Sequence, residues 1–126
     1  MAINQKTVMI IEDEPDAAEL FAEMMRVSGF HVLKSYSSLP AMNMITQEKP
    51  DVIILDIMMP DISGLDILHD MRSKTDLAKI PVVVVSAKGT PSDVREALDA
   101  GASVYLTKPV GFTDLKNAVE RALKDS

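Results

Sequence analysis

Residues 51–64 read DVIILDIMMPDISG, and within this stretch the apolar run Val52–Leu55 stands directly before Asp56. Four consecutive apolar residues, most of them β-branched, are typical of a strand that is buried on both faces. A second run of this kind, Val82–Val85, consists of valine alone. Strands buried on both faces occur in parallel sheets that helices cover on either side. The two runs therefore predict an α/β fold.

Three further apolar runs, also rich in β-branched residues, come before and after these two in the sequence. Together the runs predict strands at the following positions: Thr7–Ile11, His31–Tyr36, Val52–Leu55, Val82–Val85 and Ser103–Leu106. The segments that separate them carry apolar residues at helical spacing. Alternating strands and helices predict a parallel sheet whose crossovers are right-handed.

Proline and glycine mark the ends of two of the predicted helices. Pro15 and Pro91 suit the first turns of the first and fourth helices. Gly29 and Gly101 suit the C-terminal ends of the same two helices.

The other three helices rest on spacing. The third is predicted around Leu65–Met71, and the second, which has the weakest pattern, over Ala41–Gln47. The fifth is predicted over Leu115–Leu123, with Thr113 as its N-cap. The Lys74–Lys79 segment, which follows the third helix, is predicted to be a solvated loop.

The predicted fold is a flavodoxin-like (βα)5 doubly wound sandwich, with a five-stranded parallel sheet in the order 2-1-3-4-5. The length suits one domain. No internal repeat and no linker divides the chain, so a single domain is expected over residues 1–126.

Composition limits the classes of function. The net charge of −6 argues against a basic surface for nucleic acid. The absence of cysteine excludes disulfides, thiolate metal sites and cysteine nucleophiles. No apolar run has the length of a membrane span, and the polar segment Met1–Lys6 has no signal-peptide hydrophobic region. We therefore expect a cytoplasmic protein with no membrane contact and no direct contact with nucleic acid.

Polar side chains follow four of the predicted strands. Ligands of doubly wound sheets bind beyond the carboxyl ends of the strands, where the strand order switches. That switch falls between the first and third strands, which both end in carboxylates. Alone, each polar residue suits a cap, a turn or a surface charge, but the combination favours a site. These residues are Glu12 and Asp13, then Asp56, then Ser86, and finally Thr107-Lys108-Pro109.

These residue types suit phosphoryl chemistry. Clustered carboxylates repel one another, and a hard divalent cation offsets the repulsion. Oxygen ligands without cysteine favour Mg²⁺, or Mn²⁺ in its place, over zinc. Asp56 can attack phosphorus to form an acyl phosphate, while Lys108 and Ser86 stabilise the phosphoryl oxygens. His31 and His69 lie far from the carboxylates in sequence, which favours structural or surface roles for them.

Four segments resemble, in order and spacing, the signatures of one family. They are VMIIEDEPD at residues 8–16, the stretch 51–64 quoted above, PVVVVSA at 81–87 and YLTKP at 105–109. Together they resemble the receiver (phosphoacceptor) domains of two-component response regulators. The chain is similar to single-domain chemotaxis-type regulators, and the resemblance spans essentially its whole length.

The resemblance implies a role for each residue around the cation. Asp56 would be the phosphoacceptor and a metal ligand. Asp13 would bind Mg²⁺ directly, and Glu12 would act mainly through water. The backbone carbonyl of Met58 would complete the protein's share of the coordination, and Gly64 would shape the loop.

The resemblance also implies how the phosphoryl group is held. Ser86, Lys108 and the backbone N–H of Ala87 would bind its oxygens. Ser86 and Tyr105 would form a switch pair, in which the hydroxyl moves toward the phosphoryl group and the ring turns inward. The bond between Lys108 and Pro109 would be cis.

The implied function is phosphorelay signalling. A histidine kinase or histidine phosphotransfer protein would supply the phosphoryl group, and an effector protein or output domain would respond to it. The domain would catalyse only its own phosphorylation and dephosphorylation, with Met58 and Lys88 setting the phosphoryl lifetime. The predicted output surface consists of the fourth helix, the fifth strand and the fifth helix. The oligomeric state is expected to be a monomer or a weak phosphorylation-dependent dimer.

Three other classes of protein fit the sequence less well. A phosphatase of the haloacid dehalogenase type has a second aspartate where this chain has Met58. A nucleotide or flavin binder would need a glycine-rich phosphate loop after a strand, which is missing here. A degenerate receiver used only for docking would not need Asp56, Ser86 and Lys108. A stand-alone receiver and a part of a longer protein both remain open.

Overall fold

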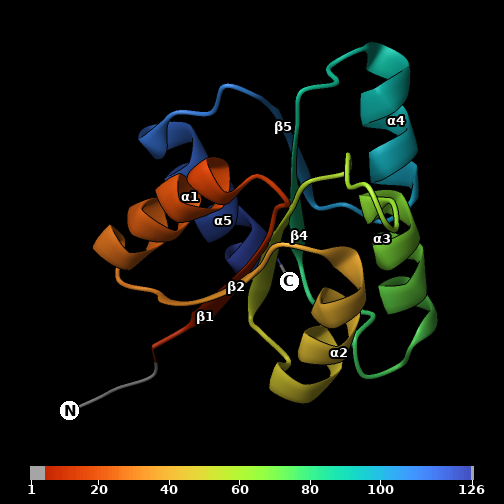
Figure 1. Ribbon diagram of the computed structural model, residues 1–126, viewed down its shortest axis with the longest axis horizontal. Helices are drawn as coiled ribbons and strands as arrows, with labels where there is room; N and C mark the ends of the chain where they lie inside the picture. Colours follow the sequence, from red (N-terminus) through yellow and green to blue (C-terminus); the bar gives the residue numbers. More distant parts are fainter. Residues whose placement is uncertain (1–4, 126) are drawn as a thin grey trace.

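The computed structural model describes residues 5–125 (Figure 1). The first four residues of the polar segment Met1–Lys6, and Ser126, lie outside the described residues. Strands and helices alternate along the chain. Their bounds are β1 Thr7–Ile11, α1 Pro15–Val27, β2 His31–Ser35, α2 Ser38–Glu48, β3 Val52–Leu55, α3 Gly64–Ser73, β4 Val82–Ser86, α4 Pro91–Asp99, β5 Val104–Thr107 and α5 Phe112–Asp125.

All neighbouring strands run parallel, in the order β2-β1-β3-β4-β5. This confirms the predicted flavodoxin-like topology. The strand order reverses between β1 and β3, and the register pairs Ile11 with Leu55 there. The residues that follow these two strands therefore emerge at the same edge of the sheet.

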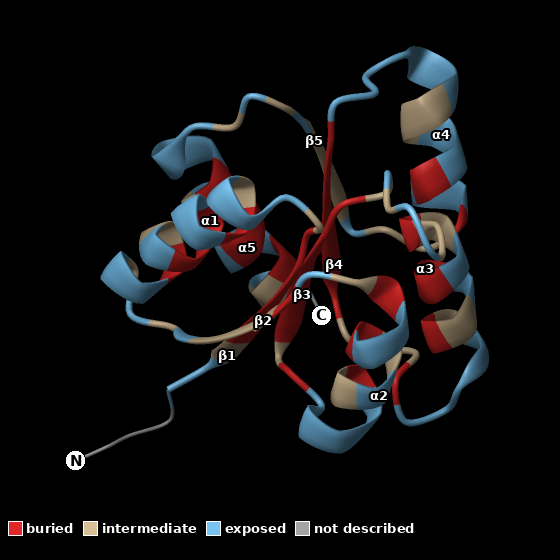
Figure 2. Ribbon diagram, viewed as in Figure 1, coloured by how far each residue is buried: buried red, intermediate tan, exposed pale blue. Residues whose placement is uncertain are grey.

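Helices cover both faces of the sheet (Figure 1). Helices α1 and α5 lie on one side, and α2, α3 and α4 lie on the other. Alternate residues of β1 divide between the two layers: Val8 and Ile10 join the cluster with α1 and α5, whereas Met9 and Ile11 join the other. Figure 2 shows the central strands as the most continuously buried part of the chain. None of the helices within residues 5–125 is long and apolar enough to cross a membrane.

The predicted helix ends at glycine are confirmed. Gly29 and Gly101 adopt φ values of +98° and +111°, in the left-handed region that side chains disfavour. Pro15 and Pro91 stand at the first positions of α1 and α4, as predicted.

Two helix starts differ from the prediction. Helix α2 begins at Ser38, three residues before the predicted start, and it contains Pro40 in its first turn. A proline is tolerated there because the first amides of a helix have no intrahelical acceptor. Helix α5 begins at Phe112, and the Leu115 amide donates to the Gly111 carbonyl at 3.1 Å. Thr113 therefore lies within the first turn, and its prediction as the N-cap is wrong.

The loop after α3 is also less solvated than predicted. Leu77 is only 2% exposed and belongs to the core cluster under α2, α3 and α4. Strand ends shift by one residue: β2 ends at Ser35, β4 includes Ser86, and β5 runs over Val104–Thr107.

Candidate functional site

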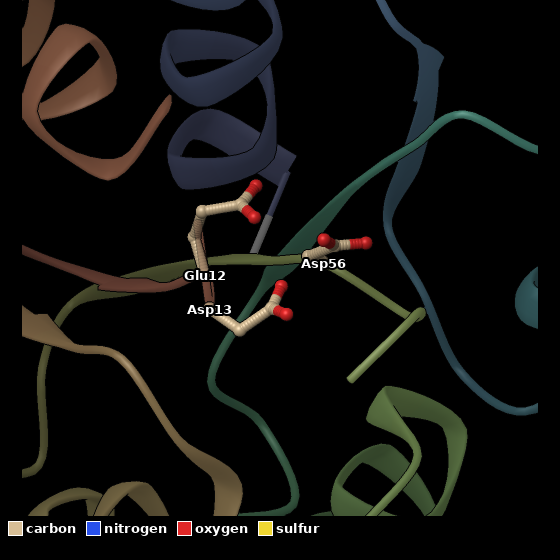
Figure 3. A group of neighbouring side chains, drawn as sticks. All are labelled: Glu12, Asp13 and Asp56. Carbon is tan, nitrogen blue, oxygen red and sulfur yellow. The ribbon is translucent and has the colours of Figure 1, made fainter. Parts of the chain in front are cut away.

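Three carboxylates meet at the switch in strand order (Figure 3). Glu12 and Asp13 extend from the end of β1, and Asp56 extends from the end of β3. One carboxylate oxygen from each lies within 4.8 Å of the other two. The neighbouring strands hold this arrangement, since the Asp56 amide donates to the Ile11 carbonyl at 3.0 Å. Within residues 5–125, this is the one such group of three metal-ligating side chains.

Lys108 brings a positive charge to these carboxylates from the end of β5. Its Nζ lies 2.7 Å from Glu12 Oε1 and 3.4 Å from Asp56 Oδ2. The Lys108 amide donates to the Ser86 carbonyl at 2.9 Å, and the bond between Lys108 and Pro109 is cis. One lysine thus bridges two carboxylates that are 96 and 52 residues away in the chain.

Burial acts on the pKa values of Glu12 and Lys108. Glu12 is only 2% exposed and Asp56 only 5%. Burial raises the pKa of the Glu12 carboxyl to about 7, although the hydrogen bond from Lys108 acts in the opposite direction. For Lys108, burial acts to lower the pKa, but the hydrogen bond to Glu12 and the charge of Asp56 outweigh it and raise the pKa. The site therefore holds excess negative charge in a poorly solvated place, which a cation would offset.

The loop after β3 is packed directly against Asp56. The Met58 amide donates to Asp56 Oδ1 at 3.0 Å, and the Gly64 amide donates to the Ile57 carbonyl at 2.9 Å. A Cβ at Gly64 would lie 2.5 Å from the Asp56 carbonyl oxygen and 2.7 Å from the Ile57 Cα. Only glycine allows α3 to begin this close to the end of β3.

Ser86 and Tyr105 are joined through the backbone of Lys88. The fully buried Ser86 accepts a hydrogen bond from the Lys88 amide through its Oγ, at 3.2 Å. The Tyr105 hydroxyl donates to the Lys88 carbonyl. Sequence reasoning singled out all three residues but missed this connection, because main-chain hydrogen bonds leave no mark in residue identity.

A cleft of about 510 Å³ opens beside the carboxylates. Its lining includes Asp13, Met58 and Met59 from the loop after β3, Lys88 from the loop after β4, and Tyr105 of β5. The Met58 side chain is 48% exposed. The space between the loops that follow β3 and β4 is thus open to solvent and to small molecules.

The two histidines lie outside the acidic group. His31 begins β2, at the sheet edge opposite the carboxylates, and His69 is exposed on α3. The exposed Ala87 follows the end of β4.

The chain belongs to the response regulator receiver domain family, which it matches over residues 8–120. It is thus a phosphoacceptor domain of two-component signalling rather than an enzyme of the usual kind. The resemblance seen in the sequence is confirmed, and the phosphatase and flavin-binding alternatives are set aside.

Curated relatives include both short and longer proteins. The chain is 29% identical over 121 residues to the polar-differentiation response regulator DivK of Brucella ovis, covering 96% of this chain and 98% of DivK. It is 35% identical over 109 residues to TcrX of Mycobacterium tuberculosis, named as a transcriptional regulatory protein. That match covers 86% of this chain but spans only about half of TcrX, 46% of its length.

Solved structures share the fold closely. A crystal structure named as a response regulator from Chloroflexus aurantiacus has a TM-score of 0.92 at 27% identity, covering 96% of this chain and 99% of that one. The receiver domain of a sensor histidine kinase from Pseudomonas aeruginosa has a TM-score of 0.88 at 22% identity, and the match covers 95% of this chain and 98% of that one. That crystal structure has a magnesium ion coordinated in its active site cleft. At 22% identity the likeness concerns the fold alone.

Proposed function

We propose that Asp56 is the phosphoacceptor of this receiver domain. The position of its carboxylate carries the proposal. Oδ1 accepts a hydrogen bond from the Met58 amide at 3.0 Å, and Oδ2 lies 3.4 Å from the Lys108 Nζ. Asp56 thus combines burial, a fixed orientation and a cationic neighbour, which suit a nucleophile that attacks phosphorus.

The phosphoryl group would come from a phosphohistidine of a histidine kinase or a histidine phosphotransfer protein. An Asp56 oxygen attacks phosphorus while the bond from phosphorus to the imidazole nitrogen breaks. The electron pair returns to that nitrogen, so the products are an aspartyl phosphate and a free histidine. Little covalent chemistry is left to the domain, and its contribution is positioning and charge stabilisation.

The donor set fits Mg²⁺. Three carboxylates offer oxygen ligands within 4.8 Å of one another, and the chain contains no cysteine that would favour a softer metal. We assign Glu12, Asp13, Asp56 and the Met58 carbonyl to the ion, with Mn²⁺ as a substitute. When bound, the ion offsets negative charge on the transferring group. The Pseudomonas aeruginosa receiver, which shares the fold, has a magnesium ion in its active site cleft, and this supports a divalent cation at the site but not the individual ligands.

Lys108, Ser86 and the amide of Ala87 would hold the phosphoryl oxygens. Lys108 already reaches Asp56, and Ser86 ends the strand next to β3. Phosphorylation adds roughly 1.5 to 2 negative charges, which would draw Ser86 Oγ away from the Lys88 amide. The bond from Tyr105 to the Lys88 carbonyl supports a coupled movement of the tyrosine.

Exposed apolar residues support a protein as the phosphoryl donor. Leu20 and Val27 of α1 are 54% and 69% exposed, and Phe112 at the start of α5 is 39% exposed. With Met24 they line a groove of about 230 Å³, and Leu20 also borders the neighbouring cleft at Lys108. A donor that docks on this face would present its histidine close to Asp56.

The response would be read at the surface of α4, β5 and α5, because Tyr105 lies in β5 and lines two grooves. An effector protein or an output domain would bind there, and the chain would be a monomer or a weak phosphorylation-dependent dimer. We further propose that the chain works as one domain over residues 1–126 in the cytoplasm. Met58 and Lys88, which border the open cleft, would set the phosphoryl lifetime by controlling water.

Intact mass after incubation with acetyl phosphate and Mg²⁺ tests the proposal. We expect a gain of one phosphoryl group, which EDTA and the Asp56→Asn substitution both abolish. Asp99→Asn, at the exposed end of α4, is the matched control and should leave the gain unchanged. If neither acetyl phosphate nor beryllofluoride with Mg²⁺ changes the wild-type protein, the phosphoacceptor assignment fails and the docking-only alternative replaces it.

A further inference from the structure

Helix α2 begins without a cap from its own N-terminal residue. Ser37 occupies the N-cap position, but its side chain makes no capping hydrogen bond. Instead, Asp61 Oδ2 accepts hydrogen bonds from the amides of Ser38 and Leu39, at 3.0 and 3.3 Å. A carboxylate at this end of a helix satisfies free amides and favours the helix dipole.

A second bond joins the same two segments. The Ser38 hydroxyl donates to the Ile62 carbonyl at 2.6 Å, and Ser38 is fully buried. The start of α2 is therefore held by Asp61 and Ile62, which belong to the loop between β3 and α3 and lie 22 to 24 residues further along the chain.

This loop carries the backbone of the proposed phosphorylation site. Near its start, the Met58 amide donates to Asp56 Oδ1 at 3.0 Å. Further along, Asp61 contacts α2, and at the end of the loop Gly64 packs against the Asp56 carbonyl. Only Met59 and Pro60 separate Met58 from Asp61, so the short connection limits how far one anchor can move without the other.

We infer that Asp61 is a positioning residue, which holds the backbone of Met58 in place by anchoring the loop to the N-terminus of α2. The inference rests on the proposed phosphoacceptor function of Asp56. It also makes the start of α2 responsive to the site, because any shift of the loop reaches the Ser38 and Leu39 amides through the Asp61 carboxylate. Leu39 is 59% exposed there, so this movement occurs at the protein surface.

The test compares Asp61→Ala with Asp61→Asn. Alanine removes the acceptor for both amides, whereas asparagine retains one acceptor oxygen in the same shape. Asp76→Ala is the matched control, since Asp76 is an exposed aspartate whose carboxylate lies 3.4 Å from Lys49, the residue at the opposite end of α2. All variants are measured well below their unfolding temperatures, as verified by circular dichroism.

The readouts are the Mg²⁺ dissociation constant and the rate of phosphorylation by acetyl phosphate. We expect Asp61→Ala to raise the Mg²⁺ dissociation constant, to slow phosphorylation, or to do both, by roughly tenfold, which is the lower end of the effect of residues that support metal ligands. Asp61→Asn should recover most of the loss, and Asp76→Ala should match the wild type. In NMR spectra, Mg²⁺ should shift the Leu39 amide of the wild type but not that of Asp61→Ala.

Wild-type values for both readouts in Asp61→Ala would overturn the inference, as would an Asp61→Asn variant no better than Asp61→Ala. Failure of the proposed function looks different, because the wild type itself would then gain no phosphoryl group. In that case the Mg²⁺ dissociation constants and the Leu39 amide shift alone decide whether Asp61 positions the loop.

Discussion

Replacing Gly64 by alanine tests the close approach of α3 to the site. The added Cβ would lie 2.5 Å from the Asp56 carbonyl oxygen and 2.7 Å from the Ile57 Cα. Both are backbone atoms, so neither can swing away as a side chain would, and the start of α3 must shift instead. Overpacking of this kind costs about 1–3 kcal/mol of unfolding free energy.

The corresponding change in thermal stability is readily measured. The entropy of unfolding is about 2.1 cal/mol/K per residue, so a chain of 126 residues loses about 4 °C of Tm for each kcal/mol. Gly64→Ala should therefore lower the Tm by about 4–12 °C in circular dichroism melts. It should also slow phosphorylation by acetyl phosphate at temperatures where the variant is folded, because Asp56 moves with its carbonyl.

Gly111→Ala is the control, because a Cβ at Gly111 would meet nothing within 4 Å. This substitution loses only the slight preference for glycine over alanine at a helix start, so the unfolding free energy should fall by less than about 1 kcal/mol. If Gly64→Ala proves no less stable than Gly111→Ala, the reasoning from close packing is refuted.

Three further predictions concern the charged residues and the cleft. Because burial raises the pKa of Glu12 to about 7 in the folded protein, the folded state without Mg²⁺ binds a proton that the unfolded state has already released. The unfolding free energy should therefore fall as the pH rises from about 4.5 to about 7, and Mg²⁺ affinity should rise over the same range. Denaturant titrations at several pH values measure the dependence of unfolding free energy on pH. If Glu12→Gln shows the same dependence as the wild type, the prediction is wrong. Arg72 donates to the carbonyls of Gly101, Ala78 and Ile80 at 2.7–3.1 Å. Arg72→Ala should therefore lower the unfolding free energy by about 2–3 kcal/mol in chemical denaturation, and Arg72→Lys should not restore the lost stability. Full stability of the lysine variant would show that a guanidinium is not needed. Met58→Asn and Lys88→Glu should change the dephosphorylation rate by several-fold, followed as loss of phosphorylated mass; unchanged rates in both variants would remove these residues from control of the lifetime.

The sequence predicted the structure best where hydrophobic patterns and the order of elements along the chain were sufficient. The runs Val52–Leu55 and Val82–Val85 predicted buried parallel strands, and both became central strands of the sheet. Helix ends at Gly29 and Gly101 were predictable because few residues other than glycine adopt their φ values. The meeting of Glu12, Asp13 and Asp56 followed from the strand order. Their assigned roles stay predictions until phosphorylation is measured.

Predictions failed where a distant segment supplies the missing interaction. Helical spacing predicts the start of α2 at Ala41, because no local pattern shows that Asp61 accepts hydrogen bonds from the amides of Ser38 and Leu39. The sequence around Leu77 predicts a solvated loop, since a single apolar residue among polar ones has no periodicity that would indicate burial. Both errors come from contacts between residues that are distant in sequence.

The α/β class and the polar residues at the strand ends were predictable from the amino-acid sequence, because hydrophobic periodicity is a local property of the chain. Crossover handedness is a general rule that left only a few strand orders, of which 2-1-3-4-5 is one. Three features depend on how the folded elements pack: Lys108 bridges Glu12 and Asp56, the Lys88 backbone joins Ser86 to Tyr105, and the loop after Asp56 is anchored to α2. The physical reason is that distances, burial and main-chain hydrogen bonds between separate segments exist only once the sheet has assembled and its helices have packed.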